Sequence, residues 1–248
     1  MPETRYNRQV LVSGIGAAGQ ERIRRTRVAL VGAGALGCAI ADQLVRGGIG
    51  YLRLIDPDTP ELSNLQRQVL IDEDDVREQR PKALAAAAKL RRANSAVAID
   101  PVVGRLDAKN ANELFSGIDI VLDGTDNFET RYLIDRTCVA ARRPWVFGGV
   151  LAWSGMSFPI VPGGPCLRCA LGPEPPSGQV PTTAEAGVLC AAVATAASLE
   201  VARALKIAVG RAVSPNLIVF DLLAETMRSI AVARDPACPV CGVPDDAG

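Results

Sequence analysis

Three glycines, Gly32, Gly34 and Gly37, follow a short apolar run with the spacing G-x-G-x-x-G. The first glycine permits a tight turn, the second lets a phosphate approach the backbone, and the third allows a helix to pack closely on a strand. Asp56 ends the next apolar run, where its carboxylate suits the hydroxyls of a ribose. The pattern predicts nucleotide binding but does not separate NAD from ATP. The alternative is a glycine-rich turn followed by a strand-terminal acid.

Positive side chains follow this motif along the chain. Lys82 falls in the expected first turn of a helix, where a cation opposes the helix dipole unless an anion is bound there. Arg67, in SNLQRQ, offers a planar set of donors for phosphate oxygens, and Arg5 and Arg8 lie in the N-terminal segment RYNRQ. An enzyme that expels pyrophosphate needs such cations, whereas a dehydrogenase keeps its pyrophosphate intact. The alternative for each cation is a solvated surface charge.

The sequence contains 0 histidines. The most common general base and the imidazole ligand of zinc are therefore absent. A reaction whose nucleophile is an already ionised carboxylate needs no base. Adenylation of a carboxylate therefore fits the composition.

Asp126, in TDNFET, stands just before an expected helix. A carboxylate at this point is a suitable ligand for a metal ion. It is equally suited to cap the helix, with Glu129 three residues further on as the second member of a capping box. We favour the metal role.

Four of the 7 cysteines form two C-x-x-C pairs, Cys166 with Cys169 and Cys238 with Cys241. Such pairs predict a tetrahedral Cys₄ zinc site of a structural kind, provided that the fold brings the distant pairs together. The alternatives are a redox dithiol and a disulfide, which is uncommon in the cytosol.

The other three cysteines are expected to be small buried residues. Cys38 and Cys138 fall inside expected helices. Cys190 stands at the start of a long alanine-rich helix, and it is also expected to be buried. The alternative for Cys190 is a thiolate activated by the N-terminus of that helix.

Composition limits the class of protein. The chain has 248 residues, of which 48% are hydrophobic, and we expect one domain over residues 1–248. A net charge of zero argues against nucleic acid as a partner. The longest apolar stretch, residues 187–199, is too short for a bilayer, and the first five residues have no signal-peptide character. We therefore expect a cytoplasmic protein without a membrane partner.

Apolar runs alternate with periodic stretches in the first part of the chain, which indicates a parallel sheet with right-handed crossovers. The later part adds antiparallel strands. The predicted fold class is therefore α/β, with a Rossmann-like mixed sheet, a parallel first half, antiparallel additions and helices on both faces. The expected strands are 28–31, 51–55, 97–103, 118–122, 146–150, 156–161, 217–220 and 227–232, and the expected helices are 36–45, 81–92, 127–141 and one that begins near 190.

The ordered motifs RYNRQ, VGAGALGC, LIDPD, SNLQRQ, RPKA, LDGTDN and the paired C-x-x-C resemble those of the MoeB/ThiF family, within the ubiquitin-activating enzyme superfamily. The resemblance runs from about Arg5 to Gly242. It implies an ATP-dependent adenylyltransferase that uses Mg²⁺. The substrate implied is the C-terminal carboxylate of a ubiquitin-like sulfur-carrier protein with a Gly-Gly terminus. The resemblance also implies a homodimer.

The resemblance also implies roles for individual residues. Asp56 would hold the ribose, and Asp126 would bind Mg²⁺. Arg8 would reach into the ATP site of the partner subunit. Contacts to the triphosphate are implied for Asn64, Arg67 and Lys82.

Residues 172–186 are rich in Pro, Gly and polar residues, and we expect a long functional loop there. Many relatives carry a cysteine in this loop that forms a covalent link with the activated carrier. Thr183 stands at the corresponding position, and a hydroxyl without a base is a poor substitute for a thiolate. We therefore expect the protein to release or hand on the acyl-adenylate.

Three other functions remain open from the sequence. The same scaffold could adenylate a peptide or a small carboxylic acid in specialised metabolism. An NAD-dependent oxidoreductase would account for the glycines and Asp56, but not for Arg67, Lys82 and the cysteine pairs. A non-catalytic module would keep a nucleotide for stability alone.

Overall fold

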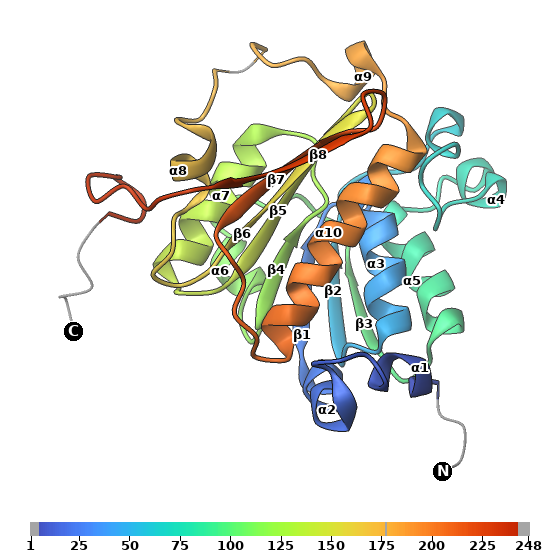
Figure 1. Cartoon of the computed structure of the whole chain (residues 1–248). Coiled ribbons are helices and arrows are strands. Elements are labelled where there is room, and N and C mark those ends of the chain that lie inside the picture. The colour runs from blue at the N-terminus through green and yellow to red at the C-terminus, as the bar shows by residue number, and fades with distance from the viewer. Residues whose placement is uncertain (1–4, 177, 243–248) are drawn as a thin grey trace.

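Eight strands form one mixed sheet in the order β3-β2-β1-β4-β5-β6-β7-β8 in the computed structural model (Figure 1). The structure describes residues 5–176 and 178–242. Three parts of the expectations fall outside these ranges: residues 1–4 of the segment judged to lack a signal peptide, Ser177 of the 172–186 loop, and residues 243–248.

The first half of the sheet is parallel. Strand β1 pairs with β2 on one side and with β4 on the other, so the chain reverses its direction of winding between β1 and β4. Ligands of open α/β sheets bind at such a reversal, beyond the carboxyl ends of the strands. The strands of this half are β1 (Arg27–Val31), β2 (Tyr51–Ile55), β3 (Ala98–Val102) and β4 (Ile120–Asp123).

The second half of the sheet is antiparallel. Strand β5 runs parallel to β4 but antiparallel to β6, and β7 and β8 continue the antiparallel order. All six residues of the edge strand β8 are exposed. The strands are β5 (Trp145–Leu151), β6 (Ser154–Ile160), β7 (Asn216–Asp221) and β8 (Thr226–Ala231).

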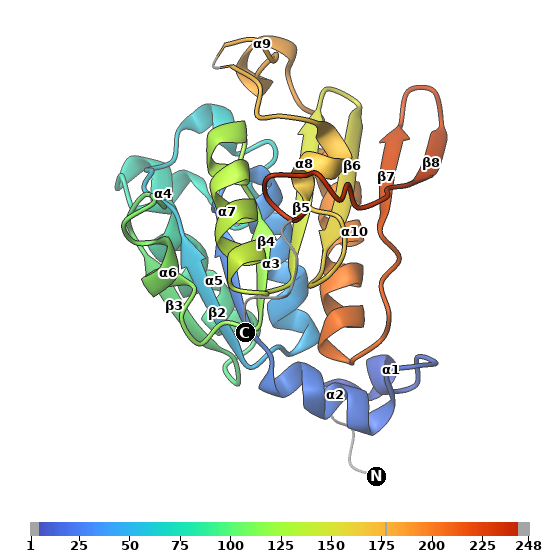
Figure 2. The same ribbon diagram turned by 90° about the vertical axis from the view of Figure 1, so that its left-hand side faces the viewer.

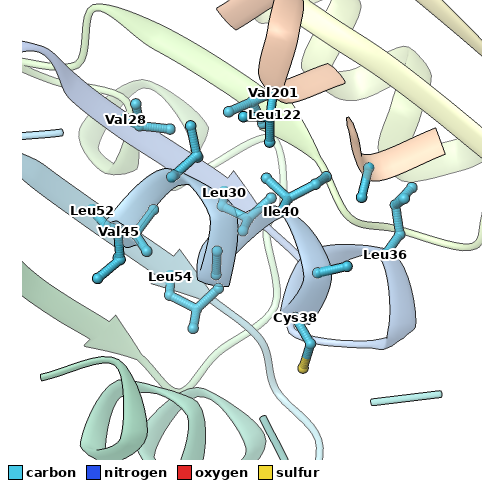
Figure 3. Packing of buried hydrophobic residues seen from close by; sticks show 14 of the residues in the cluster. Val28, Leu30, Leu36, Cys38, Ile40, Val45, Leu52, Leu54, Leu122 and Val201 are labelled. Carbon is cyan, nitrogen blue, oxygen red and sulfur yellow. The ribbon is translucent and has the colours of Figure 1, made fainter. Parts of the chain in front are cut away.

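One face of the sheet is covered by α3 (Ala35–Gly47), α5 (Lys82–Ala93) and α10 (Cys190–Ala208). Leu30, Leu54 and Leu122 point from three strands towards this layer, where Ile40 and Val201 meet them (Figure 3). Helix α3 ends at Gly48, whose φ of 83° is favourable only for glycine. The alanines of these helices allow them to lie close to one another and to the sheet.

The opposite face is covered by α6 (Ala111–Leu114), α7 (Phe128–Ala140) and α8 (Leu167–Leu171) (Figure 2). Trp145, Phe147 and Phe158 are fully buried beneath them. The predicted class, a mixed sheet with helices on both faces, is therefore confirmed. No helix in the described part of the chain is long and apolar enough to span a bilayer.

The predicted strands and long helices are confirmed to within about three residues at each end. Seven helical segments among the described residues were not predicted. Six of them have three to five residues, too few to show a periodic pattern: α1 (Asn7–Val10), the 3-10 turn η1 (Leu62–Asn64), α4 (Glu73–Arg77), α6, α8 and α9 (Thr183–Ala186). The seventh, α2 (Gly16–Arg25), has 10 residues but buries Ile23 beside Gly19 and Gln20, so its apolar stripe is too sparse to be seen in the sequence.

Glu200, in the middle of α10, is a buried acid without a partner. It is 0% exposed, and neither carboxyl oxygen accepts a hydrogen bond from any residue that the structure describes. Its carboxyl group fills the space beside Gly148 of β5, where a methyl group would overlap it. Burial, and secondarily the charge of Asp123, raise the pKa of Glu200 well above its ordinary value, which favours the neutral acid in the native state.

This burial predicts a loss of stability as the pH rises. The native state keeps the proton of Glu200 above pH 4.5, the ordinary pKa, whereas the unfolded chain releases it. The contribution is therefore fully present below pH 4.5 and is lost as the pH rises towards the raised native pKa. Glu200→Gln removes this dependence, so its stability relative to the parent increases by about 1.4 kcal/mol per pH unit in that window.

The measurement is urea unfolding of both proteins at several pH values. Glu113→Gln, at an exposed position, is the control and keeps the pH dependence of the parent. Equal slopes for Glu200→Gln and the parent contradict the prediction.

Candidate functional site

The glycine motif forms a tight turn between β1 and α3. Gly32 has a φ of 96°, and a methyl group on it would lie 2.5 Å from the carbonyl oxygen of Gly124. A methyl group on Gly37 would overlap the carbonyl oxygen of Gly32. Gly34 differs, because no described atom lies within 4 Å of the position that its methyl group would take. The turn therefore packs closely on two sides and is open at Gly34, as a phosphate-binding loop requires.

Asp56 holds the glycine loop from the end of β2. Its Oδ2 accepts a hydrogen bond from the N–H of Ala33 at 2.6 Å, and its Oδ1 accepts one from the N–H of Asp58 at 2.8 Å. Burial raises the pKa of the Asp56 carboxyl, although these two N–H groups act to lower it. Each oxygen retains a second lone pair, so the carboxylate anchors the loop and still has acceptor capacity for a ligand.

Lys82 is a buried cation beside Asp58. It is the first residue of α5 and is 9% exposed. Its backbone N–H donates to the Asp58 carbonyl at 2.9 Å, and its Nζ lies 3.3 Å from Asp58 Oδ2. The sequence placed Pro81 at the first helical position, but Pro81 is the N-cap and Lys82 follows it. The cation lies at the N-terminus of a helix, where it opposes the dipole.

Asn64 and Arg67 lie on the crossover between β2 and α4. The Asn64 side chain accepts from the N–H of Glu61 at 3.1 Å and closes the turn η1. Arg67 donates to the carbonyl oxygen of Ser63 at 2.8 Å and is otherwise half-buried. Both side chains belong to one turn that follows Asp56, Asp58 and the end of β2.

Asp126 is exposed in the connection between β4 and α7. The N-cap of α7 is Asn127, whose Oδ1 accepts from the N–H of Thr130 at 2.9 Å. The capping role that the sequence left open for Asp126 therefore belongs to its neighbour. The preceding residues Gly124 and Thr125 contact the glycine loop, so Asp126 follows directly on residues of the nucleotide-binding turn.

Arg8 lies at the other end of α3. The neighbouring Gln9 donates to the carbonyl oxygen of Gly47 at 2.9 Å, at the last residue of that helix. The helix has 13 residues, so Gly47 is about 20 Å from the glycine loop at its first turn. Figure 1 shows α1 at the edge opposite to the loop. Arg8 is exposed and does not reach the glycine loop of its own chain.

The two cysteine pairs meet, although they are separated by about 70 residues. Cys166 and Cys238 have sulfurs 3.6 Å apart, those of Cys169 and Cys241 are 3.4 Å apart, and those of Cys166 and Cys169 are 3.9 Å apart. Four thiolates around zinc at about 2.3 Å have sulfurs about 3.8 Å apart, whereas a disulfide requires about 2.05 Å. The cluster fits a tetrahedral metal and excludes disulfides within it.

The remaining thiols divide into two groups. Cys38 and Cys138 are buried as predicted, and burial raises the pKa of the Cys38 thiol to about 12. The prediction for Cys190 was wrong, because it is exposed. It is the first residue of α10, directly after Val188, which bridges to Ala152 in the β5–β6 turn. Thr183 is the first residue of α9 and lies in the loop segment before α10.

Sequence reasoning missed two residues that contact the candidate site residues or their neighbours. Asp58 connects Asp56 to Lys82, and its signal was the second acid of LIDPD. Arg131 of α7 forms a buried ion pair with Asp123 at 3.0 Å, beneath the Asp126 loop. Nothing local in the sequence marks that pair, since the two residues are eight positions apart, across a loop and the first turn of a helix.

The fold and the glycine loop define a nucleotide-binding α/β protein, and comparison with known proteins gives its family. The ThiF family model matches residues 6–240. The chain belongs to the ThiF family, which confirms the resemblance seen in its motifs.

Individual relatives agree with this assignment. The chain is 40% identical over 246 residues to a sulfur carrier protein adenylyltransferase of Thermus thermophilus, covering 96% of this chain and 90% of that protein. It is 38% identical over 240 residues to a SAMP-activating enzyme E1 of Haloferax volcanii, covering 96% and 88%. Among solved structures, E. coli MccB with ATP has a TM-score of 0.84 at 24% identity, covering 97% of this chain and 75% of that one, and shows the same fold.

The glycine loop predicts opposite behaviour for two similar substitutions. Gly37→Ala forces a methyl group into the Gly32 carbonyl and destabilises the fold by about 1–3 kcal/mol, or roughly 2–10 °C in Tm. Gly34→Ala has space for the methyl group and keeps Tm within about 3 °C. The same methyl group stands where a phosphate approaches the backbone, so nucleoside triphosphate affinity falls at least about tenfold.

Thermal unfolding and calorimetric titration measure the two effects separately. A Gly34→Ala protein that binds nucleotide as tightly as the parent contradicts the assignment of this loop.

Proposed function

We propose that this protein is an ATP-dependent adenylyltransferase that activates the C-terminal carboxylate of a ubiquitin-like sulfur-carrier protein. The observation that carries the proposal is the buried cation Lys82, linked through Asp58 and Asp56 to the glycine loop. A cation held at the start of a helix suits a ligand whose negative charge increases during the reaction. The relatives in Thermus thermophilus and Haloferax volcanii, by their names, activate carrier proteins.

The reaction follows from the residues around the loop. ATP lies over Gly32, Gly34 and Gly37, and Asp56 accepts from its ribose. The carrier carboxylate is already ionised, so it attacks the α-phosphorus without a protein base, and pyrophosphate leaves. Asn64, Arg67 and Lys82 contact the triphosphate and offset the charge that develops on the leaving group.

Asp126 fits a Mg²⁺ site. Magnesium in phosphate sites is held by one or two carboxylates together with substrate oxygens, and Asp126 offers an exposed carboxylate directly after Gly124 and Thr125, which contact the glycine loop. The bound ion would supply charge neutralisation near the α-phosphate. Since Asn127 caps α7, the Asp126 carboxylate is available for this role.

Arg8 acts in the ATP site of a partner subunit in this proposal. Its distance from the glycine loop of its own chain, about 20 Å along α3, supports a contribution from a second copy. The proposed assembly is a homodimer in which each site needs an arginine from the other chain. We also propose that residues 1–248 form one cytoplasmic adenylation domain, which the single sheet supports.

The cysteine cluster is proposed to hold Zn²⁺ through Cys166, Cys169, Cys238 and Cys241. Four thiolates fill a tetrahedral shell, so the ion would be structural and would attach the C-terminal segment to α8. The spacing of the sulfurs supports zinc over a redox dithiol.

A second substrate class has an observation in its favour. Thr183 offers no thiol in the loop before α10, so a peptide or a small carboxylic acid could replace the carrier without loss of a covalent step. E. coli MccB, whose fold this chain shares, has been solved together with AMPCPP and MccA. An NAD-dependent oxidoreductase leaves Lys82 and the cysteine cluster without a function.

Exchange of labelled pyrophosphate into ATP tests the proposal. The exchange depends on a carrier with a Gly-Gly terminus, and Lys82→Ala lowers its rate at least about a hundredfold. Lys109→Ala, at an exposed position far from the loop in sequence, keeps the parent rate. If no carrier supports exchange but a peptide or a small carboxylic acid causes pyrophosphate release from ATP, the second substrate class is selected. Binding of NAD but not of ATP excludes both adenylation classes.

The same assay tests the trans role of Arg8. Arg8→Ala and Lys82→Ala chains are each inactive alone. Mixed dimers contain one site with both residues intact, so mixing restores about a quarter of the parent activity. If subunit exchange is shown to occur and no activity is recovered, the trans assignment of Arg8 is contradicted.

Metal analysis tests the zinc site. Protein purified without chelator carries about one zinc per chain, and Cys238→Ser lowers this content because the tetrahedral shell loses a ligand. Cys190→Ser is the matched control, since that thiol is exposed and lies outside the cluster. A content far below one zinc per chain in the unchelated parent contradicts the assignment of zinc to the cysteine cluster.

A further inference from the structure

The exposed carboxylate of Asp126 has little side-chain support of its own. Its recorded contact within the described residues is a hydrogen bond from Asn127 Nδ2 at 3.5 Å. The position of this carboxylate therefore depends on the backbone on either side of it. Asn127 fixes one side through the cap of α7.

Thr125 fixes the other side. Its N–H donates to Asp123 Oδ1 at 2.8 Å, and its Oγ1 donates to the same oxygen at 2.6 Å. Its carbonyl oxygen accepts from Nη2 of Arg131 at 2.7 Å. The backbone donor, the backbone acceptor and the hydroxyl of Thr125 are therefore all bonded.

Arg131 connects Asp123 and Thr125. Its Nε donates to Asp123 Oδ2 at 3.0 Å, so one guanidinium contacts both the carboxylate and the Thr125 carbonyl. The guanidinium also lies 5.1 Å from the ring centre of Phe128 and 5.3 Å from that of Phe147. We call Asp123, Thr125 and Arg131 the brace.

The ion pair of the brace is buried and Thr125 is half-buried, and the brace contributes geometry rather than net stability. The side chains of Asp123 and Arg131 are 0% and 8% exposed. A buried ion pair contributes little stability over apolar residues of similar volume, because desolvation offsets the attraction. A planar guanidinium with two fixed donor directions does hold its acceptors in one arrangement.

The same segment contacts the glycine loop. A methyl group on Gly124 would lie 2.6 Å from the Gly32 carbonyl oxygen and 2.8 Å from the Gly37 Cα. Thr125 N lies 3.1 Å from the position that a methyl group on Gly32 would take. The segment that the brace holds is therefore packed directly against the turn that receives phosphates.

We propose that Asp123, Thr125 and Arg131 are positioning residues, which hold Asp126 at a fixed place relative to the glycine loop. This inference rests on the proposed adenylation. Loosening the brace moves the Asp126 carboxylate without removing a group that touches ATP. Turnover and the response to Mg²⁺ change, while the affinity for ATP through the glycine loop is retained.

Thr125→Val and Thr125→Ser form a matched pair. Valine keeps the shape of threonine but loses the hydroxyl, whereas serine keeps the hydroxyl. In pyrophosphate exchange, Thr125→Val lowers kcat about tenfold and raises the Mg²⁺ concentration for half-maximal rate, with KM for ATP within about twofold. Thr125→Ser restores most of both values.

Arg131→Lys is the second test, because an ammonium cannot reproduce the two donor directions of a guanidinium. Like Thr125→Val, it lowers kcat and raises the Mg²⁺ concentration for half-maximal rate. Arg136→Lys, on the exposed side of the same helix, leaves every measurement unchanged.

Amide hydrogen exchange without nucleotide gives a readout other than activity. The peptide over residues 124–127 exchanges faster in Thr125→Val than in Thr125→Ser, while exchange in β1 and α3 stays at parent rates. If Thr125→Val lowers Tm but keeps the kcat and the Mg²⁺ response of the parent, the brace has only a structural role and the proposal is contradicted.

The outcomes separate this inference from the proposed function. If the parent protein exchanges pyrophosphate and Thr125→Val has the same kcat and the same response to Mg²⁺, the positioning role of the brace is contradicted. The proposed adenylation is then unaffected. Parent protein that is inactive with every carboxylate removes both.

Discussion

The structure depends on close backbone contact among Gly32, Gly37 and Gly124. At these three positions a β-carbon would meet a neighbouring carbonyl oxygen or Cα, so only glycine allows β1, α3 and the end of β4 to approach one another. The contact sets where α3 begins and where the β4–α7 connection leaves the sheet. Asp56 and the brace then fix the polar groups around this contact, one on each side of β1.

Features with a local signal were predictable from the sequence. Four consecutive buried residues of β1 appear as the apolar run 28–31, because a parallel strand is covered on both faces. The cysteine pairs were identified by their spacing, and the structure brings their four sulfurs within 4.8 Å of one another. The glycine motif was identified in the same way, since Gly32 and Gly37 allow close backbone packing and Gly34 leaves the turn open for a phosphate.

Features that depend on tertiary contacts were not predictable. Whether Asp126 or Asn127 caps α7 is decided by one residue of register, which no pattern resolves. The exposure of Cys190, the first residue of α10, depends on which face of the helix start meets the rest of the fold. Asp123 with Arg131 is invisible to periodicity, because a buried ion pair resembles ordinary charges in a sequence.

The two cysteine pairs also have a consequence for chain entropy. A shared ion would connect positions 72 residues apart and close a loop that contains α9, α10 and the β7–β8 hairpin. A cross-link of that span lowers the entropy of the unfolded chain by an amount equivalent to roughly 4 kcal/mol. Because closure entropy grows only logarithmically, ten more residues before α9 would change it by about 0.1 kcal/mol. The segment beside the site is therefore free to vary in length among homologous chains at almost no thermodynamic cost.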